Sequence, residues 1–368
     1  AEALARRLRR GLAGGEVSTE LEVHFSFHGA TVSVESADPE LLKRVSDDFP
    51  VFAAASPARG REHLALRAAR RRPDYDALPP LLSTVHTPRN VCYSDGSVTY
   101  LDYFGKALAL WDRERRTFDV ACEDLDLLHE IVYLTILSRV SEALERDGLH
   151  RVHAFGLEAG GDAALFLMPS GGGKTTLTLG FLRLGAPFRL LSEDSPLVDR
   201  KGRVHPFPLR IGVLGTEPPP FPPEHVTFIR RMEFGPKHLV ALAAFGDCLA
   251  REAAAPRFLF VGRRSLGKGC TIRPAGKRTG AKALLEGMVV GVGLYQGVEF
   301  LLRTSLLDLF RLSGLLLSRA RAAWALLRRS EVHVVTLGRD PAANVEAVRA
   351  FLASKGFGAT GPGAAAGA

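Results

Sequence analysis

Cysteine is scarce in this chain, and long uninterrupted apolar runs are missing. Its 368 residues include four cysteines that lie far apart and form no CxxC pair: Cys92, Cys122, Cys248 and Cys270. This pattern argues against a disulfide framework or a zinc site and favours a reducing, cytoplasmic compartment. The most apolar late stretch, 301–327, contains five charged residues, so we expect no membrane span there. No charged-then-apolar signal segment opens the sequence.

Aromatic residues do not interleave with the basic runs, and this weakens the case for nucleic-acid binding that the positive net charge suggests. The formal net charge is +8 at pH 7, which suggests nucleic-acid binding when the charge gathers on one surface. Here arginine and alanine are frequent throughout, and a nucleotide ligand would itself need local positive charge. We therefore expect no nucleic-acid partner. Apolar residues make up 46% of the chain, which excludes a disordered protein, and the length allows two domains.

A glycine-rich stretch between two apolar segments organises the chain. Residues 163–168 form an apolar run that predicts a buried strand, and 175–184 have the apolar spacing of a helix. Between them lies the loop Ser170, Gly171, Gly172, Gly173, Lys174, Thr175 and Thr176. Glycines let backbone N–H groups turn toward phosphate oxygens, and a helix N-terminus adds a positive dipole end. The pattern predicts a nucleoside triphosphate site, with Lys174 on the β- and γ-phosphates and Thr175 on Mg²⁺.

The match to the phosphate-loop pattern GxxxxGK[ST] is incomplete, because Met168 stands at the first glycine position. A chance glycine cluster in a glycine- and alanine-rich chain is the alternative. We favour the phosphate loop, because a setting between a buried strand and a helix is the context that this motif requires.

Two acidic residues follow the next predicted strand. The segment 188–191 is apolar and leads into Ser192, Glu193 and Asp194. A strand, a glycine loop, a helix and a second strand that ends in carboxylates is the layout of phosphate-loop folds. Acidic residues at that position can hold Mg²⁺ or its water. The sequence therefore predicts an α/β fold with a phosphate-loop core.

Strand and helix patterns set the expected domain limits. Residues 21–34 alternate as a hairpin, 90–111 add two strands, and 122–144 have the period of a long helix. We predict a smaller N-terminal accessory α/β domain over 1–120, a connecting helix over 121–148, a phosphate-loop domain over 149–356 and a disordered tail over 357–368.

A basic stretch in the second half has two interpretations. Residues 262–282 contain seven basic residues, several glycines and no acid. The simpler interpretation is a solvated surface loop. The functional one is a mobile lid that closes over phosphates.

With these residues in view, the chain resembles the HPr kinase/phosphorylase superfamily, which shares its nucleotide core with phosphoenolpyruvate carboxykinase. The loop from Pro169 to Thr175 is similar to that family's G-x-SGxGKS, and the Ser192-Glu193-Asp194 strand end is similar to its paired aspartates. His153 lies 21 residues before Lys174, the spacing of a family histidine near the active site. The resemblance covers 151–214 well and 215–356 loosely.

The resemblance implies a core with a mixed sheet and an ATP-dependent kinase, which transfers the γ-phosphoryl group to a serine or threonine hydroxyl of a protein or peptide. Asp194 would accept or orient the hydroxyl proton, and His153 would pair with that acid. Glu193, which replaces the first family aspartate, would hold Mg²⁺ together with Thr175. We recognise no phosphorylase signature, and a homo-oligomer is left open.

Other classes of protein compete with the kinase. A regulatory or assembly protein that binds ATP and hydrolyses it slowly or not at all stays open, and Met168 favours it slightly. Carboxykinase chemistry needs His and Lys metal ligands and a substrate arginine, none of which we can place. The sequence has no LSGGQ-like segment, which argues against an ABC-type ATPase. Label transfer from ATP into an acceptor separates the kinase from the binding protein.

Overall fold

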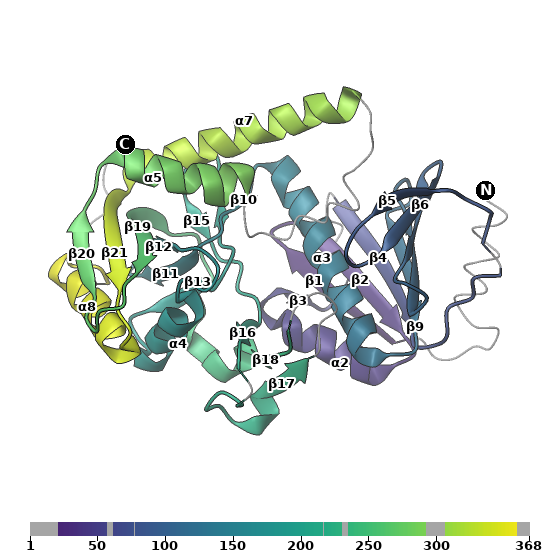
Figure 1. Ribbon diagram of the computed structural model, residues 1–368, viewed down its shortest axis with the longest axis horizontal. Coiled ribbons are helices and arrows are strands. Elements are labelled where there is room, and N and C mark those ends of the chain that lie inside the picture. Colours follow the sequence, from purple (N-terminus) through teal and green to yellow (C-terminus); the bar gives the residue numbers. More distant parts are fainter. Residues whose placement is uncertain are drawn as a thin grey trace. The chain divides into compact units, whose positions relative to one another are not determined.

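The computed structural model describes residues 21–56, 62–76, 78–215, 217–229, 235–291 and 306–358 (Figure 1). The chain divides into two compact units. The first unit comprises 1–144, 212–243 and 295–304, and the second comprises 145–211, 244–294 and 305–368. This division differs from the expected limits, because 212–243 group with the N-terminal part and most of the helix expected as a connector belongs to the first unit.

A nine-stranded mixed sheet forms the centre of the first unit. In spatial order its strands are β3 (Ala53–Ala54), β1 (Leu21–Phe27), β2 (Ala30–Ser36), β4 (Glu62–Ala69), β9 (Thr117–Cys122), β8 (Ala107–Asp112), β7 (Val98–Asp102), β6 (Val91–Asp95) and β5 (Ser83–His86). β2, β4 and β9 run parallel to one another, and the other neighbouring pairs are antiparallel.

The expected hairpin over 21–34 is confirmed by the pairing of β1 with β2. His28 and Gly29 form its turn, with φ values of 49° and 99°. Positive φ at both central residues gives the turn a twist that matches an antiparallel pair of strands. The local sequence thus fixes the register of this edge of the sheet.

Two helices of the first unit are joined by a buried hydrogen bond. They are α2 (Pro39–Asp48), followed by the 3₁₀ turn η1 (Pro50–Phe52), and α3 (Leu125–Asp147). Asp38 starts α2 by accepting hydrogen bonds from the N–H groups of its first turn. His129 Nε2 of α3 lies 2.7 Å from Asp48 Oδ2 of α2, and both side chains are buried.

The described residues within 211–248 form a small three-stranded sheet and two 3₁₀ turns. β16 (Ile211–Val213), β18 (Lys237–Val240) and β17 (Val226–Ile229) form a three-stranded sheet. The 3₁₀ turns are η2 (Pro223–His225) and η3 (Leu242–Cys248).

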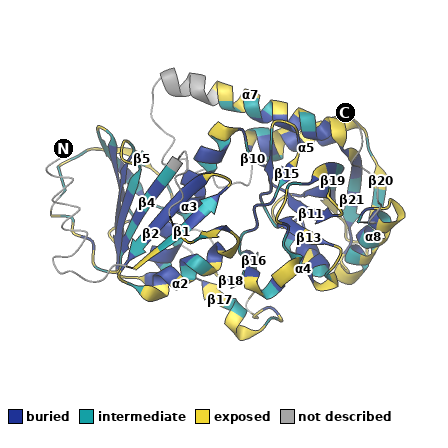
Figure 2. Ribbon diagram, turned by 180° about the vertical axis from the view of Figure 1, so that it is seen from behind, coloured by how far each residue is buried: buried dark blue, intermediate teal, exposed yellow. Residues whose placement is uncertain are grey.

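The second unit is built on a six-stranded mixed sheet with helices on both faces, so the chain is mixed α/β (Figure 2). The spatial order is β13 (Arg189–Ser192), β11 (Phe155–Ala159), β12 (Asp162–Leu167), β19 (Ala255–Arg264), β21 (Glu331–Leu337) and β20 (Thr271–Pro274). β12, β19 and β21 are parallel, and the outer pairs are antiparallel. The helices are α4 (Lys174–Leu184), α5 (Lys277–Leu284), the π-helical η4 (Leu285–Val290), α7 (Leu306–Arg329) and α8 (Pro341–Ser354), and a small sheet contains β10 (His150–Arg151), β14 (Leu197–Val198) and β15 (Val204–His205).

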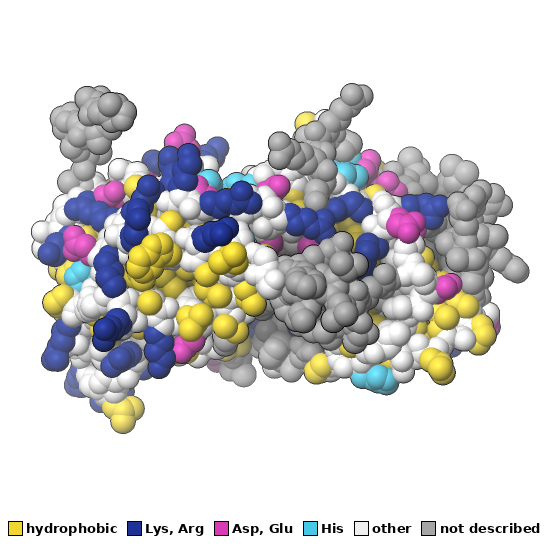
Figure 3. Space-filling model, turned by 90° about the horizontal axis from the view of Figure 1, so that it is seen from above, with side chains coloured by type: hydrophobic (Ala, Val, Ile, Leu, Met, Phe, Trp, Pro, Cys, Tyr) yellow, Lys and Arg dark blue, Asp and Glu magenta, His cyan; other side chains and the backbone are white. Residues whose placement is uncertain are grey.

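The basic stretch 262–282 is mostly regular structure, so its interpretation as a loop or lid is wrong for most of its length. It contains the end of β19, all of β20 and the first turns of α5, and 265–270 connect the two strands. Lys277 Nζ donates to the carbonyl oxygens of Leu327 and Ser330 at 2.6 and 2.5 Å. Its positive charge stabilises the C-terminal end of α7, where the helix dipole is negative. Over α5 and α7, Figure 3 shows Lys and Arg side chains bordering a hydrophobic area.

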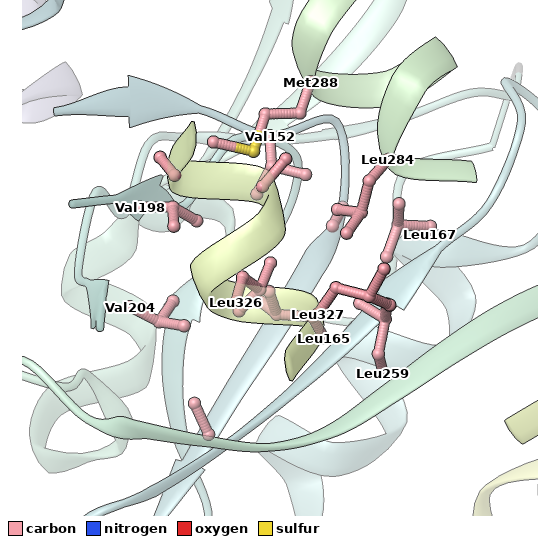
Figure 4. Close-up of a cluster of buried hydrophobic side chains, with 14 of the residues drawn as sticks. Val152, Leu165, Leu167, Val198, Val204, Leu259, Leu284, Met288, Leu326 and Leu327 are labelled. Atoms are coloured by element: carbon pink, nitrogen blue, oxygen red, sulfur yellow. The ribbon is translucent and has the colours of Figure 1, made fainter. Parts of the chain in front are cut away.

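Alternation along β12 separates the two cores of the second unit. Leu165 and Leu167 point to the face covered by α5, η4 and α7, in a cluster with Leu259, Leu284, Met288 and Leu326 (Figure 4). Phe166 points to the other face and stacks on Phe260 with ring centroids 4.5 Å apart. Each face therefore buries one set of side chains, as period-2 alternation requires.

A buried polar network joins the last residues of α3, which belong to the second unit, to β10 and α7. Glu145 Oε2 lies 2.6 Å from His150 Nδ1, and Arg319 Nη2 donates to Glu145 Oε1 at 2.9 Å. Burial opposes ionisation of Glu145, but the hydrogen bonds from His150 and Arg319 outweigh it and lower the pKa of Glu145.

The expected tail begins with an ordered residue. Phe357 is buried and lies 6.0 Å from Phe258, measured between ring centroids, so disorder does not begin at 357 as expected. Residues 359–368 lie outside the described part of the chain.

Candidate functional site

The glycine-rich loop joins β12 to α4 in the second unit. Gly171 and Gly173 have φ values of 72° and 102°, a backbone conformation that other residues rarely adopt. The N–H of Gly172 donates to the Pro169 carbonyl at 2.9 Å, which tightens the turn. No described side chain caps α4, so the N–H groups of its first turn are available to a ligand.

Lys174 lies buried at the inner end of this loop, against two other candidate residues. Its Nζ contacts His153 Nε2, donates to the Met168 carbonyl at 3.1 Å and lies 3.4 Å from Asp194 Oδ1. His153 Nε2 lies 3.2 Å from the same Asp194 oxygen. An ammonium, an imidazole and a carboxylate therefore meet at one point beside the loop.

Strand pairing explains why His153 and Asp194 meet. β11 and β13 are antiparallel, and their register places Gly156 opposite Ser192. The residues just before β11 and just after β13 therefore lie side by side, and the N–H of Ala154 donates to the Asp194 carbonyl at 3.2 Å. His153 itself lies just before β11, and its N–H donates to the Gly287 carbonyl of η4 at 2.8 Å.

Asp194 is held in its charged form. Its side chain is partly buried, with 44% of its surface exposed. Burial of the carboxylate opposes ionisation, but the hydrogen bond from His153 and the positive charges of His153, Lys174 and Arg151 outweigh it and keep the pKa of Asp194 below its usual value. The carboxylate is therefore ionised at neutral pH.

Glu193 and Thr175 form a second polar pair beside the first. Thr175 Oγ1 donates to Glu193 Oε1 at 2.6 Å. Among the described residues, no group of three or more His, Cys, Asp or Glu side chains is placed to hold a metal ion. A magnesium ion that arrives with phosphates needs only one or two protein oxygens, since phosphate and water supply the others. The hydroxyl and carboxylate of this pair fit that requirement.

Met168, at the position where a glycine was expected, points away from the loop. Its side chain is buried against Gly262 of β19. A Cβ added at Gly262 would lie only 2.3 Å from Met168 Cγ. The Met168 Cβ also lies 3.1 Å from where a Cβ at Gly172 would be. Two glycines thus make room for the methionine, and its carbonyl oxygen is the group that accepts from Lys174.

The remaining loop residues lie on the open side. Ser170, Gly171 and Thr176 are exposed. A pocket opens next to Thr176, and its lining includes Gly173, Arg264, Leu337, Arg339 and Asn344. Sequence reasoning missed this pocket, because its lining comes from four elements. The Asp340-Pro341 helix start was the one available signal, since it places Arg339 just before the N-terminus of α8.

Comparisons with known proteins add no family. No protein-family model matches the chain, and no curated protein matches it. In the described ranges, no helix combines the length and apolar character needed to cross a bilayer.

Proposed function

We propose that the second unit binds ATP with Mg²⁺ and transfers the γ-phosphoryl group to a hydroxyl of a protein or peptide. The observation that carries this proposal is the meeting of Lys174, His153 and Asp194 at the inner end of a glycine loop. The resemblance to the HPr kinase/phosphorylase superfamily supports the same reaction and suggests a serine or threonine acceptor.

The loop supplies the binding of the phosphates. The uncapped N–H groups at the start of α4 would bind oxygens of the β-phosphate, and Lys174 would leave the Met168 carbonyl to reach the β- and γ-phosphates. Thr175 and Glu193, which are hydrogen-bonded to each other, would hold Mg²⁺, and the ion would supply charge neutralisation at the phosphate oxygens. Phosphoryl transfer asks for such positioning and charge compensation more than for covalent catalysis.

Asp194 handles the proton of the acceptor. The acceptor oxygen forms a bond to the γ-phosphorus, the bond from that phosphorus to the bridging oxygen of ADP breaks, and the hydroxyl proton passes to the Asp194 carboxylate. In the free protein Lys174 and His153 weaken this base. Nucleotide binding draws Lys174 away and brings negative phosphates close, and both changes raise the pKa of Asp194. His153 keeps the carboxylate in position through its contact at 3.2 Å.

A regulatory protein that binds ATP without transferring phosphate is the second candidate. The contacts of Lys174 favour it, because the ammonium is already bound to His153 and to the Met168 carbonyl. A nucleotide must compete with both of those contacts before the lysine can act on its phosphates.

Two variants test binding and chemistry separately. Lys174→Ala should lose most of the thermal stabilisation that Mg-ATP gives the parent. Asp194→Asn should keep that stabilisation, while radiolabel transfer from ATP to acceptors, sought first among neighbouring gene products, falls by about 10²–10⁴-fold, the loss expected for a general base. Asp199→Asn is the matched control, because Asp199 is also paired with a histidine, His205, at 3.0 Å.

Each outcome decides one step. Equal stabilisation of the parent and of Lys174→Ala by Mg-ATP would contradict the phosphate loop. Full transfer by Asp194→Asn would remove that residue from the chemistry. Binding of ATP by the parent with no transfer to any acceptor would favour the regulatory protein.

A further inference from the structure

The pocket beside Thr176 is a rigid, positively charged site next to the glycine loop. Arg264 lies at the end of β19, and its Nη1 lies 4.0 Å from where a Cβ at Gly173 would be. Arg339 lies between β21 and α8. Both residues line the pocket. An anionic or π-rich ligand would find two planar cations there.

Backbone contacts hold Arg339 in place. Its N–H donates to the Gly267 carbonyl at 2.8 Å. A Cβ at Gly338 would lie 2.3 Å from the Lys268 carbonyl oxygen, so only glycine allows this close approach of the 265–270 turn. Asp340 caps α8 by accepting hydrogen bonds from Ala342 and Ala343. The pocket therefore exists before a ligand enters.

Helix geometry fixes which end of a nucleotide reaches the pocket. Successive residues of an α-helix turn by about 100°, so Lys174 and Thr176 leave the start of α4 on opposite sides. Lys174 points to His153 and Asp194, the side of the γ-phosphate in the proposed function. Thr176 lines the pocket. A triphosphate with its γ end at Lys174 therefore directs its α-phosphate and nucleoside toward Thr176.

The amide side chain in the lining, a group that can read adenine, is already used. The Asn344 side chain accepts from the Gly338 N–H at 2.8 Å and donates to the Gly338 carbonyl at 3.0 Å. Among the described residues that line the pocket there is no carboxylate. Leu337 and the two arginines offer apolar and planar surfaces, which contact any base through its faces.

We propose that this pocket binds the nucleoside half of the nucleotide, between Arg264 and Arg339, without distinguishing adenine from guanine. The inference rests on the proposed function, because it takes the glycine loop as the site of the phosphates. It assigns the orientation of the nucleotide and its selectivity, which the loop alone does not define.

Inorganic triphosphate separates the nucleoside site from the phosphate site, because it has the phosphates and no nucleoside. We would measure the Kd of Mg-ATP, Mg-GTP and Mg-triphosphate for the full chain by calorimetry. In Arg339→Ala, the Kd of both nucleotides should rise about tenfold, the loss of one cation–π or charged contact, while the Kd of triphosphate stays within about twofold. In the parent, ATP and GTP should bind within about threefold of each other.

Arg263→Ala is the matched control. Arg263 is the neighbour of Arg264 on β19, and its side chain leaves the strand on the opposite face. It should leave all three Kd values unchanged. Equal weakening of triphosphate and nucleotides by Arg339→Ala would assign the pocket to phosphate and overturn the inference. Unchanged nucleotide binding in that variant, or a preference of more than tenfold for one base, would also overturn it. Failure of the parent to bind any of the three ligands would overturn the proposed function as well.

Discussion

The packing of Met168 against Gly262 gives the sharpest test of the loop geometry. Gly262→Ala places a methyl carbon 2.3 Å from Met168 Cγ, 3.0 Å from its Cε and 3.2 Å from its Sδ. Met168 is 4% exposed, so its side chain has little room to move away. Overpacking of this kind costs about 1–3 kcal/mol. We expect Gly262→Ala to lower the free energy of unfolding of the second unit by that amount.

The partner substitution makes the test specific. Met168→Ala leaves a cavity and costs about 2–5 kcal/mol by itself. It also removes the three atoms that the new methyl group meets. The double variant should therefore be more stable than the sum of the single effects predicts, by about 1–3 kcal/mol.

We would follow unfolding in increasing urea by the hydrogen exchange of peptides from β19. These peptides report the stability of the second unit separately from that of the first. Gly269→Ala is the control, because a Cβ there meets nothing within 4 Å. A cost below about 0.5 kcal/mol for Gly262→Ala, or strict additivity in the double variant, would refute the described packing of Met168.

Two further predictions follow from groups whose pKa is shifted by burial and hydrogen bonding. The lowered pKa of Glu145 stabilises the folded second unit above the unfolded value of about 4.3, and this contribution is lost as pH falls through the folded value. Urea unfolding between pH 7 and 3 should therefore show a smaller pH dependence in Glu145→Gln than in the parent, and an equal dependence would contradict the network. Burial raises the pKa of the Cys122 thiol to about 11, so Cys122 should be alkylated more slowly at pH 8 in the native chain than the half-buried Cys248. Mass spectrometry of the labelled peptides measures both rates, and faster labelling of Cys122 would contradict its burial.

Local signals predicted the elements whose partners are close in the sequence. The 21–34 hairpin follows from alternation and from the His28-Gly29 turn. The strand, glycine loop and helix around 163–184 follow from two apolar periods and a glycine cluster. In both places the residues that define the structure lie within a few positions of one another, so the chain shows the pattern directly.

Long-range pairing was beyond those signals. β20 has only four residues, contains Arg273 and Pro274, and is stabilised by pairing with β21. Composition therefore predicted a loop where an edge strand exists, and proline is tolerated there because an edge strand needs fewer ladder bonds. The small sheet of β16, β17 and β18 was likewise assigned to the second domain by its place in the sequence, although it groups with the first unit.

The candidate site shows the same limit at the level of single residues. Glu193 and Asp194 are adjacent, and the sequence alone gave no reason to separate their roles beyond a family resemblance. The structure distinguishes them by their neighbours, since Glu193 accepts from Thr175 and Asp194 faces His153 and Lys174.

That separation depends on where β13 ends. β13 ends at Ser192, and Glu193 and Asp194 lie in the bend that follows it, where the two carboxylates face different partners. In the proposed function, one carboxylate lies beside the hydroxyl that would hold Mg²⁺, and the other lies beside the lysine that would move when phosphates bind. A single acid could not do both, because a carboxylate committed to a metal ion is a poor base. The doubled acid at this strand end therefore fits phosphoryl transfer better than nucleotide binding alone, which would need only the Glu193 and Thr175 pair.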